Sequence, residues 1–333
     1  MSTNKMKLDI SQQALSDIFR KHNLGNIQST DLMTGGEFNS VYKVVTDDCK
    51  KYVIKIAPSS DIEVLTYEHN LIQSEVFAYE KLAELKSVHI PEIFGYSQSS
   101  DELYQYLIME FIEGKTLSNS KLTDEETDKV MYSLGQTMAE IHNISVPEGF
   151  GYLQNGLQKT WKDAYLSMVD SIIHDGLNKK AKIPYLEEIK SLINQNLSVL
   201  DEVKTTALIH FDLWAGNIIL DKNNNLYSLI DCERVMFGDV MGEFISLDYI
   251  TPFSAEKNKS LIAGYQSRAN SRIEFNNNEM IRLYLMRLYL GLIANVESYY
   301  RYPKMSLTFI GRYLFSKHFL KVSIRELKKY TQK

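Results

Sequence analysis

Short apolar runs separated by turn residues recur along the first third of the chain. Runs of this length that are rich in Val, Ile and Tyr indicate strands. There are five such runs. The first ends at residues 32–34, and the others lie at residues 41–45, 52–56, 93–96 and 104–111. Because short turns join the first three, they predict an antiparallel sheet in this part of the chain.

Longer stretches with helical periodicity surround these strands. Thr123 and Glu126 fit a capping box, which indicates where one of the helices begins. The expected helices cover residues 9–23, 62–86, 123–142, 160–175 and 184–201, and the pattern from residue 254 to the end is also helical. The chain therefore combines a small sheet with a larger helical part.

The most informative pattern lies between residues 207 and 239. Three short runs rich in Ile and Leu indicate strands at residues 207–209, 218–220 and 226–230. The turn at residues 222–225 joins the last two into a hairpin. Polar side chains follow at the strand ends, where a rigid frame can hold them: Asp212, Asn217 and Asp231.

Two aspartates and an asparagine in these places are suited to phosphoryl transfer. Mg²⁺ takes oxygen ligands, usually one or two carboxylates with phosphate oxygens and water, and Asn217 and Asp231 can supply two of them. Asp212 can orient a substrate hydroxyl and accept its proton. The spacing H-x-D-x-x-x-x-N, followed by a hairpin and an Asp, is the arrangement of protein kinases. We assign His210, which begins the pattern, a structural role.

At these residues the chain resembles the aminoglycoside phosphotransferase and choline kinase-like family of small-molecule kinases. Residues 210–217 look like the family's H-G-D-L-x-x-x-N loop, with Phe211 in place of the usual glycine. Residues 236–239, Met-Phe-Gly-Asp, are similar to the segment after the metal-binding Asp in hygromycin phosphotransferase. The resemblance covers about residues 30–250.

The resemblance implies a fold of the α+β class with two lobes, like that of protein kinases. The N-terminal lobe would hold the antiparallel sheet and one long helix and bind the nucleotide. The C-terminal lobe would be mostly helical and carry the catalytic loop and the acceptor site. We expect the lobes to span residues 1–112 and 113–333.

The resemblance also assigns residues to the nucleotide, which would be ATP or GTP. Gly35, Gly36 and Asn39 are similar to the glycine loop of small-molecule kinases, where backbone N–H groups approach phosphates. Lys55 would contact the α- and β-phosphates. The backbone of the hinge between the lobes would bind the adenine edge, at Glu110, Phe111 and Ile112.

Five glutamates of the helix predicted at residues 62–86 compete to pair with Lys55. They are Glu63, Glu68, Glu75, Glu80 and Glu84. We prefer Glu75, because its surroundings are similar to the family's E-x-x-x-x-x-x-L helix. The other four are expected on a solvated helix face.

The segment after Asp231 favours a small acceptor. Only about seven residues separate it from Asp239, whereas a protein kinase needs a long activation segment there. Asp239 is expected to cap the next helix. Glu233, Asp239 and Glu243 are candidates to line the acceptor site, although caps and solvated faces explain such acids equally well.

Composition narrows the class further. The chain has 333 residues, a net charge of −5 and a pI of about 5.9, with no basic stripe of the kind that binds nucleic acid. Two cysteines give no disulfide framework, which indicates a reducing cytoplasm. The most apolar stretch, residues 283–296, is too short and too charged to span a membrane. The oligomeric state stays open.

The sequence thus predicts a kinase that moves the γ-phosphate of ATP or GTP to a hydroxyl of a small molecule, with Mg²⁺ as its metal ion. An aminoglycoside-type antibiotic is the first choice of acceptor, with antibiotic resistance as the role, because the resemblance points there. The alternative is a metabolic acceptor such as choline, a fructosamine, homoserine or a sugar. A catalytically silent nucleotide-binding module is a third hypothesis, although every catalytic position is filled.

Overall fold

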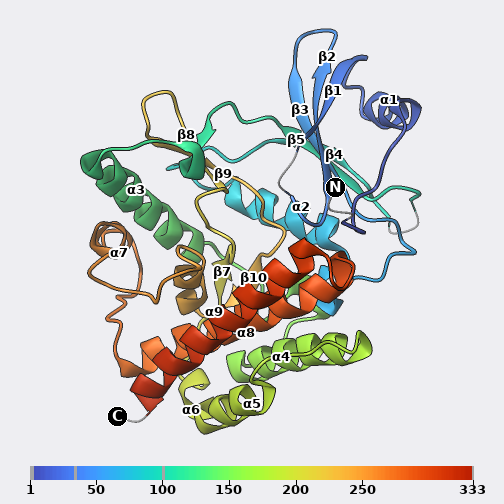
Figure 1. Cartoon of the computed structure of the whole chain (residues 1–333). Helices are drawn as coiled ribbons and strands as arrows, with labels where there is room; N and C mark the ends of the chain where they lie inside the picture. The colour runs from blue at the N-terminus through green and yellow to red at the C-terminus, as the bar shows by residue number, and fades with distance from the viewer. Residues whose placement is uncertain (1–3, 34–35, 100–101, 332–333) are drawn as a thin grey trace.

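A five-stranded antiparallel sheet forms the N-terminal part of the molecule (Figure 1). The computed structural model describes residues 4–33, 36–99 and 102–331. The strands lie in the order β1-β2-β3-β5-β4. Their bounds are β1 Ile27–Met33, β2 Ser40–Thr46, β3 Lys51–Ile56, β4 Ile93–Tyr96 and β5 Tyr106–Glu110. All five strands predicted here are confirmed.

Alternating side chains fix which face of the sheet each helix covers. On β5, Tyr106 and Ile108 pack with Leu15 and Phe19 of α1 (Gln12–Lys21). The neighbouring β5 residues, Leu107 and Met109, join the core cluster that contains the apolar side of α2 (Leu71–Leu82). Since side chains alternate between the faces of a strand, α1 and α2 cover opposite faces.

The helix predicted at residues 62–86 is wrong in its first half. The α-helix begins only at Leu71, after Asn70 in a left-handed conformation (φ 56°) and the short 3-10 helix η1 (Thr66–Glu68). Glu68 is buried, and its carboxylate accepts a hydrogen bond from the Leu65 N–H (3.0 Å). Contacts with distant parts of the chain therefore override the local helical preference.

The C-terminal part is mostly helical. Its α-helices are α3 Asp124–His142, α4 Trp161–Asn178, α5 Leu186–Gln195, α6 Leu197–Leu200, α7 Lys259–Gln266, α8 Asn277–Arg301 and α9 Leu307–Thr331. Short 3-10 helices lie at η2 Leu117–Asn119, η3 Leu153–Asn155 and η4 Val240–Ile245. The helix predicted at residues 184–201 is divided into α5 and α6, and η4 begins directly after Asp239, which caps it as predicted. Helices α8 and α9 lie side by side across the molecule (Figure 1).

Two small sheets carry the catalytic stretch. The predicted hairpin is confirmed as β8 (Ile218–Leu220) and β9 (Leu226–Leu229), and it is joined by β6 (Lys115–Thr116). Strand β7 (Ala207–Ile209) pairs instead with β10 (Met236–Gly238). The two pairings hold the loop after β7 and the segment after β9 against each other.

The fold class is confirmed: an antiparallel sheet is followed by a helical lobe. Strand β5 ends at Glu110 and β6 begins at Lys115, and the exact division near residue 112 stays a prediction. Within the described part of the chain, no helix is long and apolar enough to cross a membrane.

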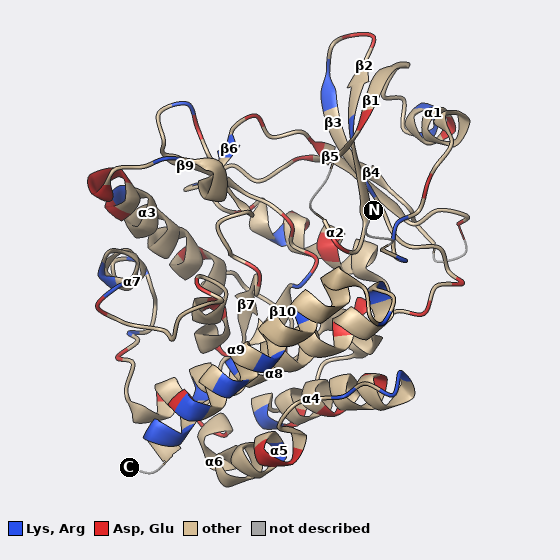
Figure 2. Ribbon diagram, viewed as in Figure 1, with Lys and Arg blue, Asp and Glu red and all other residues tan. Residues whose placement is uncertain are grey.

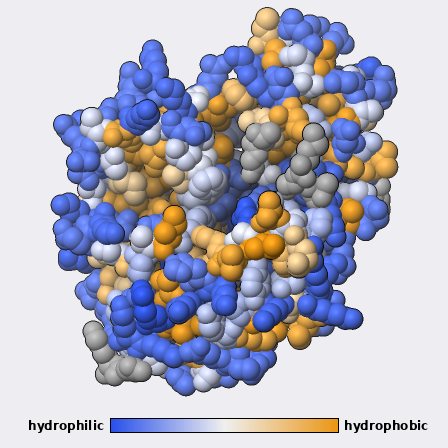
Figure 3. Space-filling model, in the orientation of Figure 1, coloured by the Kyte–Doolittle hydropathy of each residue, from blue (hydrophilic) through white to orange (hydrophobic). Residues whose placement is uncertain are grey.

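The surface is mixed in charge and hydropathy. Acidic residues occupy the first turn of α3, where the helix dipole favours them, and basic residues follow the C-terminal half of α9 (Figure 2). Apolar side chains gather over the start of α9 (Figure 3), where Leu307 and Leu314 are exposed.

Candidate active site

The loop after β7 carries Asp212 and is held by hydrogen bonds. The Asn217 amide nitrogen donates to the Asp212 carbonyl (2.9 Å) and to its Oδ2 (3.1 Å). The Tyr249 hydroxyl donates to Oδ1 (2.8 Å). Burial raises the pKa of Asp212 to about 6, against the opposing effects of Arg234 and of the Tyr249 hydrogen bond. A carboxyl with this pKa is ionised at neutral pH and can still accept a proton.

A second group of charges joins three elements. The Lys55 ammonium on β3 lies 2.5 Å from Glu75 Oε1 on α2 and 2.5 Å from Asp231 Oδ1 after β9. The predicted pairing of Lys55 with Glu75 is therefore present. We call Lys55, Glu75 and Asp231 the lysine cluster. Burial works against the charge of Lys55, but the two carboxylates outweigh it and raise its pKa.

The backbone of the catalytic loop explains the roles of two neighbours. Phe211 has φ 64°, a conformation that favours glycine, yet its ring is fully buried against Tyr289 (6.0 Å between ring centroids). His210 is buried and lies 3.6 Å from the Cys232 sulfur. Both therefore hold the loop in place, as expected for His210.

Two of the acceptor candidates are corrected by the structure. Glu243 is fully buried, and its carboxylate accepts from the N–H groups of His210 (2.8 Å) and Phe211 (3.0 Å). Asp239 is also buried, accepts from Met241 N–H (3.1 Å) and pairs with Arg282 (2.8 Å). Both carboxylates are occupied inside the protein, so neither lines an acceptor site.

The third candidate, Glu233, contacts the loop between β1 and β2. Its Oε2 accepts from the Asn39 amide nitrogen (3.0 Å) in the loop between β1 and β2. Burial and the nearby Asp231 raise the pKa of Glu233 to about 8. Asn39 thus ties the glycine loop to the segment that carries Asp231.

A lysine that the sequence pattern did not single out contacts the glycine loop. The Lys7 ammonium donates to the Asn39 carbonyl. A Cβ added to Gly36 would have its nearest neighbours at 3.7 Å, one of them the Lys7 nitrogen, so packing alone does not require glycine there. Gly35 lies outside the described residues.

The predicted hinge residues comprise the last residue of β5, Glu110, and the two residues after it. The Glu110 N–H donates to the Glu92 carbonyl (2.8 Å), and the Phe111 N–H makes a longer bond with the Lys51 carbonyl (3.4 Å). The Ile112 N–H has no hydrogen-bond partner among the described residues. Of the three predicted hinge residues, Ile112 has the amide best placed to serve a nucleotide.

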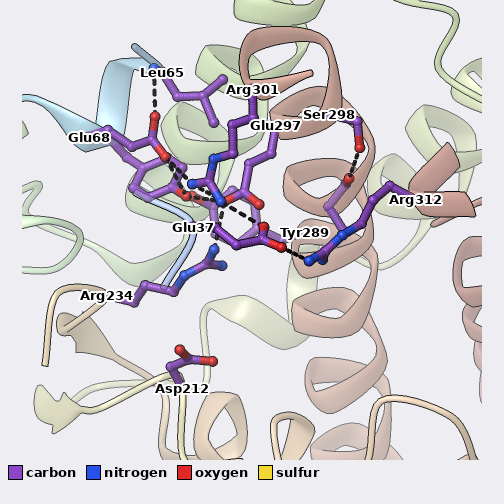
Figure 4. A network of polar contacts seen from close by, with 12 residues as sticks. Glu37, Leu65, Glu68, Asp212, Arg234, Tyr289, Glu297, Ser298, Arg301 and Arg312 are labelled. Atoms are coloured by element: carbon purple, nitrogen blue, oxygen red, sulfur yellow. Dashed lines mark hydrogen bonds and ion pairs between the residues drawn. The ribbon is translucent and has the colours of Figure 1, made fainter. Parts of the chain in front are cut away.

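A second cluster of buried charge lies near Asp212 (Figure 4). Glu297 Oε1 accepts from Arg234 (2.6 Å), Arg301 (3.1 Å) and the Tyr67 hydroxyl (2.6 Å). Arg301 also pairs with Glu68 (2.6 Å). We call Arg234, Arg301, Glu68 and Glu297 the arginine cluster.

Arg234 lies between Asp212 and the other members of the arginine cluster (Figure 4), and it lowers the pKa of the Asp212 carboxyl. The cluster also reaches the glycine loop, because Glu37 pairs with Arg301 (3.1 Å) and with Arg312 of α9. No spacing rule links residues so far apart in the sequence. The sequence signal that could have pointed to Arg234 is its position three residues after Asp231.

The donors near Asp212 fit a magnesium ion. Asn217 uses its amide nitrogen for Asp212, which leaves its oxygen as a ligand, and Asp231 adds a carboxylate. The described residues contain no group of three acidic, His or Cys side chains that could hold a metal alone. Two protein oxygens suit Mg²⁺ when phosphate and water complete its shell.

Comparison with known proteins agrees with this geometry. A model of the phosphotransferase enzyme family matches residues 32–275, more than half of the chain. The chain belongs to this family, which confirms the predicted family and the enzyme class, phosphotransferase.

Solved structures with the same fold include aminoglycoside phosphotransferases. A thermostable mutant of APH(4)-Ia, in ternary complex with AMP-PNP and hygromycin B, has a TM-score of 0.67 at 17% identity, covering 94% of this chain and 98% of that one. The streptomycin–ATP–APH(2")-IIa ternary complex has a TM-score of 0.62 at 17% identity, covering 96% and 99%. A putative aminoglycoside phosphotransferase from Ralstonia eutropha has 0.66 at 15%, covering 96% and 99%.

The curated relatives match over a shorter stretch. A subtelomeric hrmA-associated cluster protein of Aspergillus fumigatus is 25% identical over 142 residues, which are 41% of this chain and 27% of that protein. The match therefore spans about a quarter of the length of the curated relative.

Proposed function

We propose that the chain transfers the γ-phosphate of ATP, or of GTP, to a hydroxyl group of a small molecule. The observation that carries the proposal is the convergence of Asp212, Asn217 and the lysine cluster where the two lobes meet. Phosphoryl transfer depends mainly on positioning and on stabilisation of charge, and this set supplies both.

Each residue has a task in this proposal. Asp212 orients the acceptor hydroxyl and takes its proton, and Tyr249 and Asn217 hold its carboxylate in place. Lys55 contacts the α- and β-phosphates, with Glu75 fixing its position. Asn217 and Asp231 would hold Mg²⁺, which supplies charge neutralisation at the phosphates when it is bound.

The same proposal covers the remaining nucleotide contacts. Gly35, Gly36 and Asn39 form the loop over the phosphates. Ile112, with the backbone of Glu110 and Phe111, meets the adenine edge.

Both cysteines are free thiols, which fits a reducing cytoplasm as the compartment.

For the acceptor we propose an aminoglycoside-type antibiotic first, and with it a role in resistance. The similar structures were solved with hygromycin B and streptomycin. The alternative is a metabolic acceptor such as choline, a fructosamine, homoserine or a sugar.

The test is nucleotide consumption across a panel of acceptors. Magnesium-dependent loss of ATP or GTP is measured with hygromycin B, streptomycin, spectinomycin, choline, amino acids and sugars. Reactions without acceptor and with Asp212→Asn are the controls. A phosphorylated antibiotic supports the resistance enzyme, whereas a hit only on a metabolite supports the alternative.

The silent module is tested in the same experiment. Nucleotide binding without acceptor-dependent turnover, across all members of the panel, would favour it over the kinase. Turnover that survives in Asp212→Asn would instead contradict the role of that aspartate.

A further inference from the structure

A cavity of about 190 Å³ opens in the C-terminal lobe behind the segment that carries Tyr249. Its walls come from η4, from the segment between η4 and α7, and from the middle of α8. The lining residues are Phe244, Leu247, Asp248, Thr251, Pro252, Phe253, Ser254, Lys257, Asn258 and Arg287. None of these has a task in the proposed phosphoryl transfer.

Arg287 in the wall of this cavity is a buried cation that forms no ion pair with a carboxylate among the described residues. Its side chain is only 1% exposed and stacks on the Phe319 ring, with 4.5 Å from Cζ to the ring centroid. Nη1 donates to the Asp248 carbonyl (3.0 Å), but Nε and Nη2 have no partner in the part of the chain that the structure describes. Since arginine stays protonated, an unpaired guanidinium inside a protein carries a large desolvation cost.

Three other arginines that are buried or half-buried in the same molecule each pair with a carboxylate. On α8 itself, Arg282 contacts Asp239 (2.8 Å) and Glu202 (2.6 Å). Arg301, at the end of that helix, contacts Glu68 (2.6 Å), and Arg234 contacts Glu297 (2.6 Å). Arg287 alone in this group forms no ion pair within 4 Å among the described residues, so a bound anion could pair with it directly.

Two acids, Asp248 and Glu326, act on the charge of Arg287 without forming an ion pair with it. Asp248 accepts at Oδ1 from the N–H groups of Ile250 (2.7 Å) and Thr251 (2.9 Å), and at Oδ2 from the Thr251 hydroxyl. Glu326 on α9 accepts from Arg325 (2.8 Å) and Lys329 (2.6 Å). Neither lies within 4 Å of the guanidinium.

The rest of the cavity supplies what a small anionic molecule needs. Lys257, a second cation, lines it and has no carboxylate within 4 Å among the described residues. Hydroxyl and amide groups are provided by Ser254 and Asn258, and an apolar wall by Phe253. Cavities that bind small molecules combine apolar walls with a few polar groups in this way.

We propose that this cavity binds a small molecule that carries an oxyanion, a carboxylate or a phosphate group, with Arg287 and Lys257 as its counter-charges. The planar guanidinium suits the oxygens of either group. The cavity adjoins the active site through one residue, since Tyr249 follows Asp248 and donates to Asp212. The proposal does not depend on phosphotransferase activity.

The test is calorimetric titration of the whole chain with inorganic phosphate and, separately, with citrate. Saturating AMP-PNP is present to keep the anions from the nucleotide side, without free Mg²⁺, because citrate would chelate it. At least one of the two anions should bind. Lys257→Ala should weaken its affinity at least about threefold, and Arg287→Met at least about tenfold, because each removes a charged contact. Lys259→Ala, which changes an exposed lysine outside the cavity, is the matched control and should leave the affinity unchanged.

Absence of binding, or equal affinity in the wild type and in Lys257→Ala, overturns the proposal. Should Arg287→Met fail to fold, the pair Lys257→Ala and Lys259→Ala decides alone. A preference for phosphate or for citrate identifies the anionic group, and either preference supports the site. If the bound anion is the acceptor's own group, phosphate competes with the acceptor in turnover; a separate ligand leaves the acceptor KM unchanged.

Discussion

Members of two clusters of buried charge act on the Asp212 carboxyl, and the clusters differ in balance. The lysine cluster sets one cation against two carboxylates, Glu75 and Asp231. The arginine cluster sets two arginines against two glutamates, with the Tyr67 hydroxyl as a further donor. Surplus negative charge can be neutralised by a metal ion, whereas a balanced cluster has nothing left to bind. The difference indicates that the first cluster serves the reaction and the second holds the lobes together.

The largest effect is expected at Asp212, on which members of both clusters act. Asp212→Asn removes the proton acceptor but keeps the size and most hydrogen bonds of the side chain. We expect kcat to fall by about 10³-fold, because a positioned general base contributes on the order of 10²–10⁴. Nucleotide affinity, measured by calorimetry, should stay within about threefold, since the lysine cluster is untouched.

A second aspartate variant, Asp239→Asn, is the control for this prediction. Asp239→Asn changes a buried aspartate that pairs with Arg282 and caps η4. It should lower the melting temperature without removing turnover from the folded fraction. Loss of nucleotide affinity in Asp212→Asn would mean that this side chain supports the nucleotide directly, contrary to the role proposed here.

These differences also explain what could be predicted from the sequence. The lysine cluster and Asp212 follow from local spacing: a strand lysine, a helix glutamate and the H-x-D-x-x-x-x-N loop. The arginine cluster joins Glu68, Arg234 and Glu297, which are separated by long stretches of chain, so no period or motif reveals it. The same long-range pairing of Glu68 explains why the helix predicted at residues 62–86 begins only at Leu71.

Two acceptor candidates, Glu243 and Asp239, were wrong for a related physical reason. An acidic residue near a motif can line a site, cap a helix or bond to a loop, and its sequence position is the same in each case. Glu243 bonds to two N–H groups of the catalytic loop, and Asp239 caps η4 and pairs with Arg282. Only the arrangement in space distinguishes these tasks.

The next largest effect is expected on stability, from breaking the arginine cluster. Arg301→Met leaves Glu68 and Glu297 buried with less compensation, and removing one partner of a buried pair costs about 3–5 kcal/mol. Unfolding by denaturant measures the change in the free energy of unfolding. Arg20→Met, which breaks an exposed pair with Asp17, is the control and should change little. Equal, small effects of both changes would show that the cluster does not hold the lobes together.

A smaller effect is expected from restoring the family's glycine at Phe211. Glycine relieves the left-handed backbone, worth about 1–2 kcal/mol, but removes a fully buried ring, worth about 3–5 kcal/mol. Phe211→Gly should therefore lower the free energy of unfolding by about 1–4 kcal/mol. Phe211→Leu keeps most of the packing and should cost less. A stabilising Phe211→Gly would mean that backbone strain outweighs the packing of the ring.

The smallest effect is a shift in the pH dependence of turnover. The pKa of Asp212 is raised by burial to about 6, and the base must be ionised, so the rate should rise with pH through about 6 and level off above it. The Tyr249 hydroxyl stabilises the ionised form, so Tyr249→Phe should move the midpoint upward. The rate at pH 6 would then fall a few-fold, by about the shift that one lost hydrogen bond produces, with little change at pH 8. Tyr227→Phe, which changes an exposed side chain of β9, should leave the profile unchanged. If Tyr249 acts only on the acceptor, KM changes equally at both pH values and the midpoint stays in place.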